Sequence, residues 1–134
     1  MIFINHNKEP ISTQIIEYLN KIGFNNLLII DEDESVSQEL IYELATKPED
    51  INNVMSKYQW ESELFIFIEP SKISFKEIIG QCFKYQIPLI AINSSFNVNA
   101  SETQLPFFYK HISIPDNTLN SSDQQTLLNI LEMI

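Results

Sequence analysis

The residues most able to do chemistry in this chain form one acidic cluster, Asp31 to Glu34. Several carboxylate oxygens held close together are the ligands that a hard cation such as Mg²⁺ prefers. The cluster also follows an apolar run and precedes a helical pattern, and acidic side chains at a helix start are stabilised by the helix dipole without any ligand. We therefore expect the cluster to open a helix, and we assign no metal site to it.

Three further residue types could act as acid, base or nucleophile. His6 follows a strand-like segment, but no carboxylate partner can be assigned to it by spacing, and His111 lies beside a predicted edge strand. We expect both histidines at the surface. Cys82 lies in an apolar helical pattern, where a cysteine usually behaves as a small buried hydrophobe. Neither histidine is near Cys82 in sequence, so we assign no metal site and no Cys–His nucleophile.

Two resemblances would give the acidic residues a role. The segment Leu27 to Val36 resembles the start of a receiver domain, but it falls on the second strand, and Glu69 stands where the phosphorylated aspartate would be. Met1 to His6 looks similar to the start of a Toll/interleukin-receptor fold, which implies Glu77 as an NAD-cleaving glutamate. The alternative is a solvated helix carboxylate. We predict no catalytic residue and no cofactor.

Composition limits the classes of partner. The 134-residue chain fits one domain, residues 1–134, and its two glycines form neither a GxGxxG nor a Walker pattern, which excludes nucleotide binding by those loops. The net charge is −10 and every basic residue is a lysine, so autonomous nucleic-acid binding is disfavoured. We find no membrane span, signal peptide or transit peptide, and we predict no membrane or small-molecule partner.

Apolar runs with strand character alternate with helical patterns, which is typical of βαβ units. The chain is therefore predicted to be α/β, a flavodoxin-like three-layer sandwich with a mostly parallel five-stranded sheet in the order 2-1-3-4-5. The predicted strands are Met1–Asn5, Leu27–Ile30, Leu64–Ile68, Pro88–Ile92 and His111–Ile114.

Helices are predicted between these strands. One runs from about Ile11 to Gly23, and a second carries Val36 to Leu44. A short third helix is expected within residues 49–62, and a fourth spans Ile73 to Tyr85. A last helix, Ser121 to Ile134, is predicted to be capped by Ser121 or Ser122.

The order of features from Glu63 onward resembles the small-subunit ribosomal protein S-two family. Glu63 to Lys72 looks like the family's Asp-Leu, strand, Asp-Pro-x-Lys segment, and Ile87 to Ile92 is similar to its Ile-Pro-Val-Ile-Ala-Ile strand. Ile114-Pro115-Asp116-Asn117 stands where the family has Ile-Pro-Gly-Asn, before a terminal helix. The family's Asp after the Ile-Pro strand is Asn93 or Ser94 here.

This resemblance implies a structural constituent of the mitochondrial (organellar) small ribosomal subunit, docked through other small-subunit ribosomal proteins with limited rRNA contact. The candidates for that rRNA contact are Lys72, Lys76 and Lys84, which form a modest basic stripe, and Lys110. The composition indicates a codon bias toward A and T, which fits a protein made in the mitochondrial matrix or, alternatively, in a bacterial cytoplasm. The alternatives in function are a receiver-like or Toll/interleukin-receptor-like signalling domain and an acidic immunity-type inhibitor.

Overall fold

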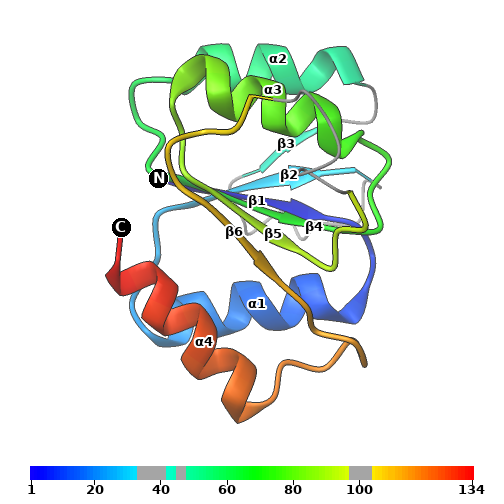
Figure 1. Cartoon of the computed structure of the whole chain (residues 1–134), viewed down its shortest axis with the longest axis vertical. Helices are drawn as coiled ribbons and strands as arrows, with labels where there is room; N and C mark the ends of the chain where they lie inside the picture. The colour runs from blue at the N-terminus through cyan, green and yellow to red at the C-terminus, as the bar shows by residue number, and fades with distance from the viewer. Residues whose placement is uncertain (33–41, 45–47, 97–103) are drawn as a thin grey trace.

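The protein is described by a computed structural model covering residues 1–32, 42–44, 48–96 and 104–134. Figure 1 shows one sheet between two pairs of helices, α2 and α3 on one face and α1 and α4 on the other. The strands are β1 Ile2–His6, β2 Leu27–Asp31, β3 Tyr42–Leu44, β4 Leu64–Ile68, β5 Leu89–Ile92 and β6 Tyr109–Ile112. The helices are α1 Pro10–Lys21, α2 Pro48–Lys57, α3 Phe75–Tyr85 and α4 Ser121–Glu132.

The strand order within these residues is β3-β2-β1-β4-β5-β6, and all neighbouring strands run parallel. Leaving β3 aside, this is the predicted order 2-1-3-4-5, so the flavodoxin-like α/β prediction is confirmed. Ile4 pairs with Ile29 on one side and with Ile66 on the other, which makes β1 a central strand. Parallel strands covered on both faces are usually apolar throughout. Strand β4 is entirely apolar, and β2 is apolar except for its last residue, Asp31.

The strand β3 corrects one prediction. The expected helix over Val36 to Leu44 ends in a strand instead, with Tyr42 pairing with Ile29 of β2. Residues 33–41 lie outside the described part of the chain. Short apolar segments fit both a helical and a strand period, and here the free edge of β2 supplies a hydrogen-bonding partner that no local pattern reveals.

The core has one layer on each face of the sheet. Ile66 and Ile90 point to the α1 and α4 side, and Phe67 belongs to the layer under α2 and α3. That second layer is aromatic: the Phe67 and Phe75 rings stack with centroids 5.5 Å apart. The side chains of Ile66, Phe67, Ile90 and Ile92, on the two neighbouring strands β4 and β5, are all fully buried.

Local signals explain where the helices begin and end. Pro10 occupies the first turn of α1, and Gly23 follows that helix with φ 101°, a conformation that favours glycine. The predicted serine cap of α4 is wrong, because Asn120 caps it. The Asn120 side chain accepts a bond from the Asp123 N–H (2.9 Å), and the Asp123 carboxylate accepts one from the Asn120 N–H (3.3 Å). This reciprocal capping box leaves Ser121 inside the helix.

The Phe67→Ala substitution should lower the free energy of unfolding by about 3 to 5 kcal/mol, because it leaves a cavity inside the aromatic layer. Phe83→Ala removes the same atoms from a side chain that is 41% exposed, and it should cost much less. Urea denaturation of both variants measures the difference. Equal losses in the two variants would contradict the assignment of Phe67 to the core.

Candidate functional site

In doubly wound sheets, ligands bind beyond the carboxyl ends of the strands, where the strand order reverses. In this sheet the reversal lies between β1 and β4, because the chain builds outward from β1 to β3 and then returns to β4. A cavity of about 340 Å³ lies at that point. Its lining comes from the loops after β1, β2 and β4: Asn7, Lys8, Glu32, Pro70, Ser71 and Lys72.

Glu32 is the centre of the hydrogen bonds around this cavity. Its side chain has an exposed fraction of 0%. One carboxylate oxygen, Oε1, accepts bonds from the backbone N–H groups of Lys72 (2.8 Å) and Ile73 (3.2 Å) and from the Ser71 hydroxyl. The other, Oε2, accepts from the Asn5 amide at 3.0 Å. A buried carboxylate is tolerated when it is satisfied in this way, so Glu32 joins the ends of β1 and β2 to the loop after β4.

Two asparagines extend the sheet beyond its backbone pairs. Asn5 is 1% exposed, and its side-chain amide donates to the Ile68 carbonyl (2.9 Å) and accepts from the Ile68 N–H (2.7 Å). Asn93 makes the same pair of bonds with the backbone of Ile114, at 3.0 and 2.6 Å. Each amide therefore acts as one more peptide group in the ladder and fixes the carboxyl ends of two neighbouring strands.

The loops beside the cavity are held by further polar contacts. The Asn7 side chain donates to the Ile68 carbonyl (3.2 Å) and accepts from the Glu9 N–H (3.1 Å). The Lys72 ammonium donates to the Glu32 carbonyl at 3.3 Å. Lys8 is exposed and has φ 67°, in the left-handed region. These contacts fix the cavity walls by hydrogen bonds within the chain.

Of the acidic cluster Asp31 to Glu34, which we expected to open a helix, the structure describes only Asp31 and Glu32, and neither lies in a helix. Asp31 is the last residue of β2, and both Asp31 and Glu32 are buried. Asp33 and Glu34 lie outside the described residues. Sequence reasoning missed the role of Glu32 because two of its four donors are backbone groups some 40 residues further along the chain, which leave no signal in residue type.

The other candidate residues do not come together with Glu32 in one site. Glu77 lies in the first turn of α3, where its Oε1 accepts from the Gln81 amide at 3.3 Å. The His6 Nε2 lies 3.4 Å from the Thr13 hydroxyl, and His111 is exposed on β6. Across residues 1–32, 48–96 and 104–134, no group of three or more His, Cys, Asp or Glu side chains is placed to hold a metal ion.

Cys82 is fully buried in α3, as predicted. Burial raises the pKa of its thiol far above the ordinary value, because the apolar surroundings disfavour the thiolate. The thiolate is the nucleophilic form. Cys82 is therefore a packing residue in the folded chain.

The predicted lysine stripe is only partly on one helix. Helix α3 begins at Phe75 rather than Ile73, because Ser74 is extended (φ −62°, ψ 133°), so Lys72 lies in the preceding loop beside the cavity. Lys76 and Lys84 are exposed on α3, and the Lys84 ammonium lies 5.0 Å from the centre of the Tyr85 ring. Lys110 is exposed on β6.

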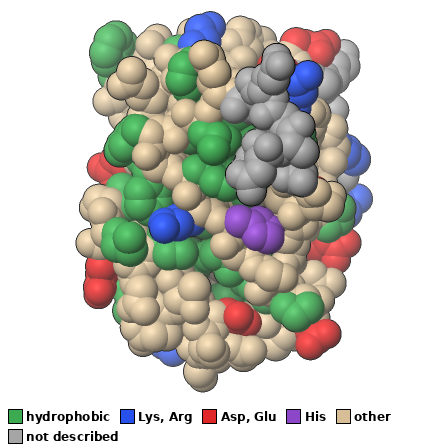
Figure 2. All heavy atoms as spheres, in the orientation of Figure 1, with side chains coloured by type: hydrophobic (Ala, Val, Ile, Leu, Met, Phe, Trp, Pro, Cys, Tyr) green, Lys and Arg blue, Asp and Glu red, His purple; other side chains and the backbone are tan. Residues whose placement is uncertain are grey.

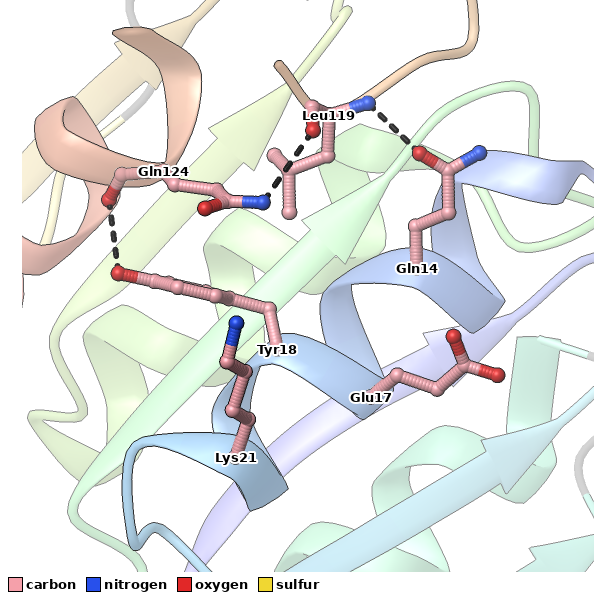
Figure 3. Close-up of a pocket in the computed structure, with 6 residues that line it drawn as sticks. All are labelled: Gln14, Glu17, Tyr18, Lys21, Leu119 and Gln124. Atoms are coloured by element: carbon pink, nitrogen blue, oxygen red, sulfur yellow. Dashed lines mark hydrogen bonds between the residues drawn. The ribbon is translucent and has the colours of Figure 1, made fainter. Parts of the chain in front are cut away.

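A second cavity, of about 210 Å³, lies between α1 and the start of α4 (Figure 3). The Gln14 side chain accepts from the Leu119 N–H at 2.7 Å, and the Tyr18 hydroxyl donates to the Gln124 carbonyl at 3.1 Å. Gln124 in turn donates to the Leu119 carbonyl at 3.4 Å. These bonds attach α4 to α1, and we interpret this cavity as a by-product of helix packing.

Large hydrophobic side chains are exposed mainly at the opposite edge of the sheet, where the strands begin. The side chain of Trp60, in the turn before β4, is 90% exposed, and that of Phe107, before β6, is 81% exposed. The same edge holds the loop before β2, the end of α3 and the C-terminus, which contribute Phe24, Phe83, Met133 and Ile134. Hydrophobic side chains also appear along this side in Figure 2. We call these six residues the strand-start surface.

A comparison with protein-family models, with curated proteins and with solved structures finds no match to this chain. Among the described helices, none combines the length and hydropathy needed to cross a bilayer.

Glu32→Gln should lower the free energy of unfolding by about 3 kcal/mol, because a glutamine amide would face the Asn5 amide, donor against donor, and the charge-assisted bonds would be lost. Glu132→Gln makes the same change on an exposed side chain and should stay within about 0.5 kcal/mol. Chemical denaturation at neutral pH tests both variants. Equal stability of the Glu32→Gln variant and the wild-type chain would contradict the network.

The Cys82 thiol should resist alkylation in the folded chain at mildly alkaline pH. Its raised pKa means that the thiolate fraction there is far below that of a free cysteine. Iodoacetamide labelling followed by mass spectrometry should therefore show slow modification that becomes fast only in denaturant. Rapid labelling under native conditions would show that Cys82 is accessible.

Proposed function

We propose that the chain is a structural protein that binds other proteins within a larger assembly and does no chemistry of its own. The observation that carries the proposal is the strand-start surface. Single exposed apolar residues are normal on soluble proteins, but here six large ones come from segments that all lie at the end of the sheet where the strands begin. Aromatic residues and methionine are enriched at protein interfaces, and tryptophan is a frequent hot spot.

The side chains that could do chemistry support the same conclusion. Both carboxylate oxygens of Glu32 accept hydrogen bonds from the chain itself, and Cys82 is held as a buried thiol. Glu77 bonds to its own helix through Gln81. Among the residues that the structure describes, no contact of these three would make one of them a general base or a nucleophile.

The assembly that we propose is the mitochondrial small ribosomal subunit. The support is the resemblance to the ribosomal protein S-two family from Glu63 onward, together with the place of its motifs in the fold. The Ile-Pro strand corresponds to β5, and Ile114 to Asn117 lies in the loop between β6 and α4.

Protein, rather than RNA, is the proposed partner of the strand-start surface. The chain carries a net charge of −10 and has no arginine, so phosphate groups would be repelled over most of its surface. Apolar side chains gain free energy by leaving water, and a protein surface can cover them. Any rRNA contact would fall to the exposed lysines Lys72, Lys76, Lys84 and Lys110.

The native protein, isolated from its source cells, should sediment with the small ribosomal subunit in a sucrose gradient. Trp60→Ala should weaken this association roughly 30-fold, because truncating an interface tryptophan typically costs about 2 kcal/mol. Asn53→Ala, which shortens an exposed polar side chain on α2, is the control and should leave the association unchanged. Quantitative mass spectrometry of the gradient fractions gives the bound share of each variant.

Two outcomes would contradict the proposal. One is a native protein that remains at the top of the gradient as a single species, as a free-standing inhibitor or signalling domain would. The other is NAD cleavage by the isolated chain that is lost in Glu77→Ala, which would make Glu77 catalytic and favour the Toll/interleukin-receptor-like alternative.

A further inference from the structure

Strand β6 lies at one edge of the sheet, and among the described residues it pairs only with β5. It is the strand nearest to the viewer in Figure 1. The side chains of Lys110, His111 and Ser113 are exposed and that of Tyr109 is half-buried, so solvent reaches most positions of this segment. An edge strand offers its outward N–H and C=O groups to a strand of another chain.

The hydrogen bonds to β5 show which backbone groups of β6 point inward. The carbonyls of Phe108 and Ile112 accept from the N–H groups of Leu89 (3.0 Å) and Asn93 (2.9 Å). Further along, both the N–H and the carbonyl of Ile114 bond to the Asn93 side chain. In a ladder, residues whose backbone groups face one neighbour alternate with residues whose groups face the other side. The even-numbered residues from Phe108 to Ile114 therefore face β5.

The backbone groups of Tyr109, His111 and Ser113 consequently face away from β5. These three residues form an outer edge of donors and acceptors that is centred on His111. The edge ends after Ser113, because the next outward position is Pro115, which has no N–H to donate. It begins at Tyr109, because Phe107 lies in a bend before the strand.

A second copy of β6 matches this outer edge when the two strands run antiparallel. With His111 opposite the partner's His111, Tyr109 lies opposite the partner's Ser113, and Ser113 lies opposite the partner's Tyr109. Residues placed opposite each other in this way exchange both of their backbone hydrogen bonds, which gives about six bonds in all. Each outward N–H of one copy then meets an outward carbonyl of the other, so the edge is complementary to itself.

The side chains select this register over its neighbours. Around His111, the large Tyr109 faces a small serine and Lys110 faces the partner's Ile112, so no two ammonium groups are opposed. A twofold centre at Lys110 would place two ammonium groups opposite each other, which is destabilising. A centre at Ile112 would pair Tyr109 with the partner's Pro115, which lacks the donor.

We propose that two copies of this chain dimerise through β6, antiparallel about a twofold axis at His111, so that their sheets become one continuous sheet. The contact lies along the side of the sheet, whereas Trp60 lies at the end where the strands begin. The proposal therefore goes beyond the docking function and does not depend on it. A strand pairing of this length buries little surface, so the dimer belongs to the weak and transient class.

Sedimentation equilibrium of the isolated chain, between about 10 µM and 1 mM, should show a monomer–dimer equilibrium that depends on concentration. Amide hydrogen exchange at both ends of this range locates the contact. The amides of Tyr109, His111 and Ser113 should exchange more slowly at the higher concentration, in proportion to the share of dimer. The amides of Lys110 and Ile112, which face β5, should be protected equally at both concentrations and are the internal control.

Two variants at the centre of the contact separate the backbone bonds from the side chain. His111→Pro removes the outward N–H, which β5 does not use, and should weaken the dimer at least about tenfold. His111→Thr replaces the side chain but keeps the N–H, and its dimerisation should stay within about twofold of the wild type. Circular dichroism shows whether each variant is folded before the comparison.

The proposal is overturned if the wild-type chain is a monomer at about 1 mM. It is also overturned if folded His111→Pro dimerises as tightly as His111→Thr, or if the three outward amides are equally protected at every concentration, as pairing within one chain would make them. Should His111→Pro fail to fold, the concentration dependence of the wild-type amides decides alone. These outcomes leave the Trp60 sedimentation experiment unaffected.

Discussion

The arrangement of the carboxyl edge of this sheet depends on one buried carboxylate. Removing an ionised carboxylate from water costs several kcal/mol, and the cost is offset only when donors surround it. Glu32 receives such donors from Asn5 at the end of β1 and from residues 71–73 after β4. Because one charge must satisfy all of these contacts, the loops after β1, β2 and β4 adopt one arrangement together.

The two edges of the sheet thereby acquire different characters. At the carboxyl edge, polar side chains are used to hold loops, and the cavity that they enclose is lined by Lys8 and Lys72. At the other edge, where the helices end and the strands begin, Trp60 and Phe107 are exposed to solvent. Figure 1 places the N-terminus and the C-terminus on this second side as well.

Much of the fold could be predicted because its signals are local. The apolar runs of β4 and β5 are long enough for strands covered on both faces, and their alternation with helical patterns gives the parallel order. Strand β3 was not predictable in this way, since its pairing with β2 depends on an open sheet edge. The Asn120 cap was missed because two serines beside it carry an equally good capping signal.

The candidate site was harder to predict than the fold. The predicted topology places the loops after the strands at one edge of the sheet, where ligands of such sheets bind, and those loops include Asn7, Lys8 and Pro70 to Lys72. The role of Glu32 could not be derived, because an acidic run after a strand has the same appearance whether it opens a helix or accepts bonds from a distant backbone. Its burial is a tertiary property that depends on donors from the loop after β4.

The most direct test of this account is amide hydrogen exchange at Lys72 and Ile73, whose N–H groups donate to Glu32. Bonds to a buried carboxylate should slow their exchange at least on the order of a hundredfold relative to an unstructured peptide, and this protection should fall in Glu32→Gln. The exposed loop at Asp116 and Asn117 provides the comparison within the same molecule. If Lys72 and Ile73 exchange as fast as that loop, Glu32 does not hold the carboxyl edge together, and the account is wrong.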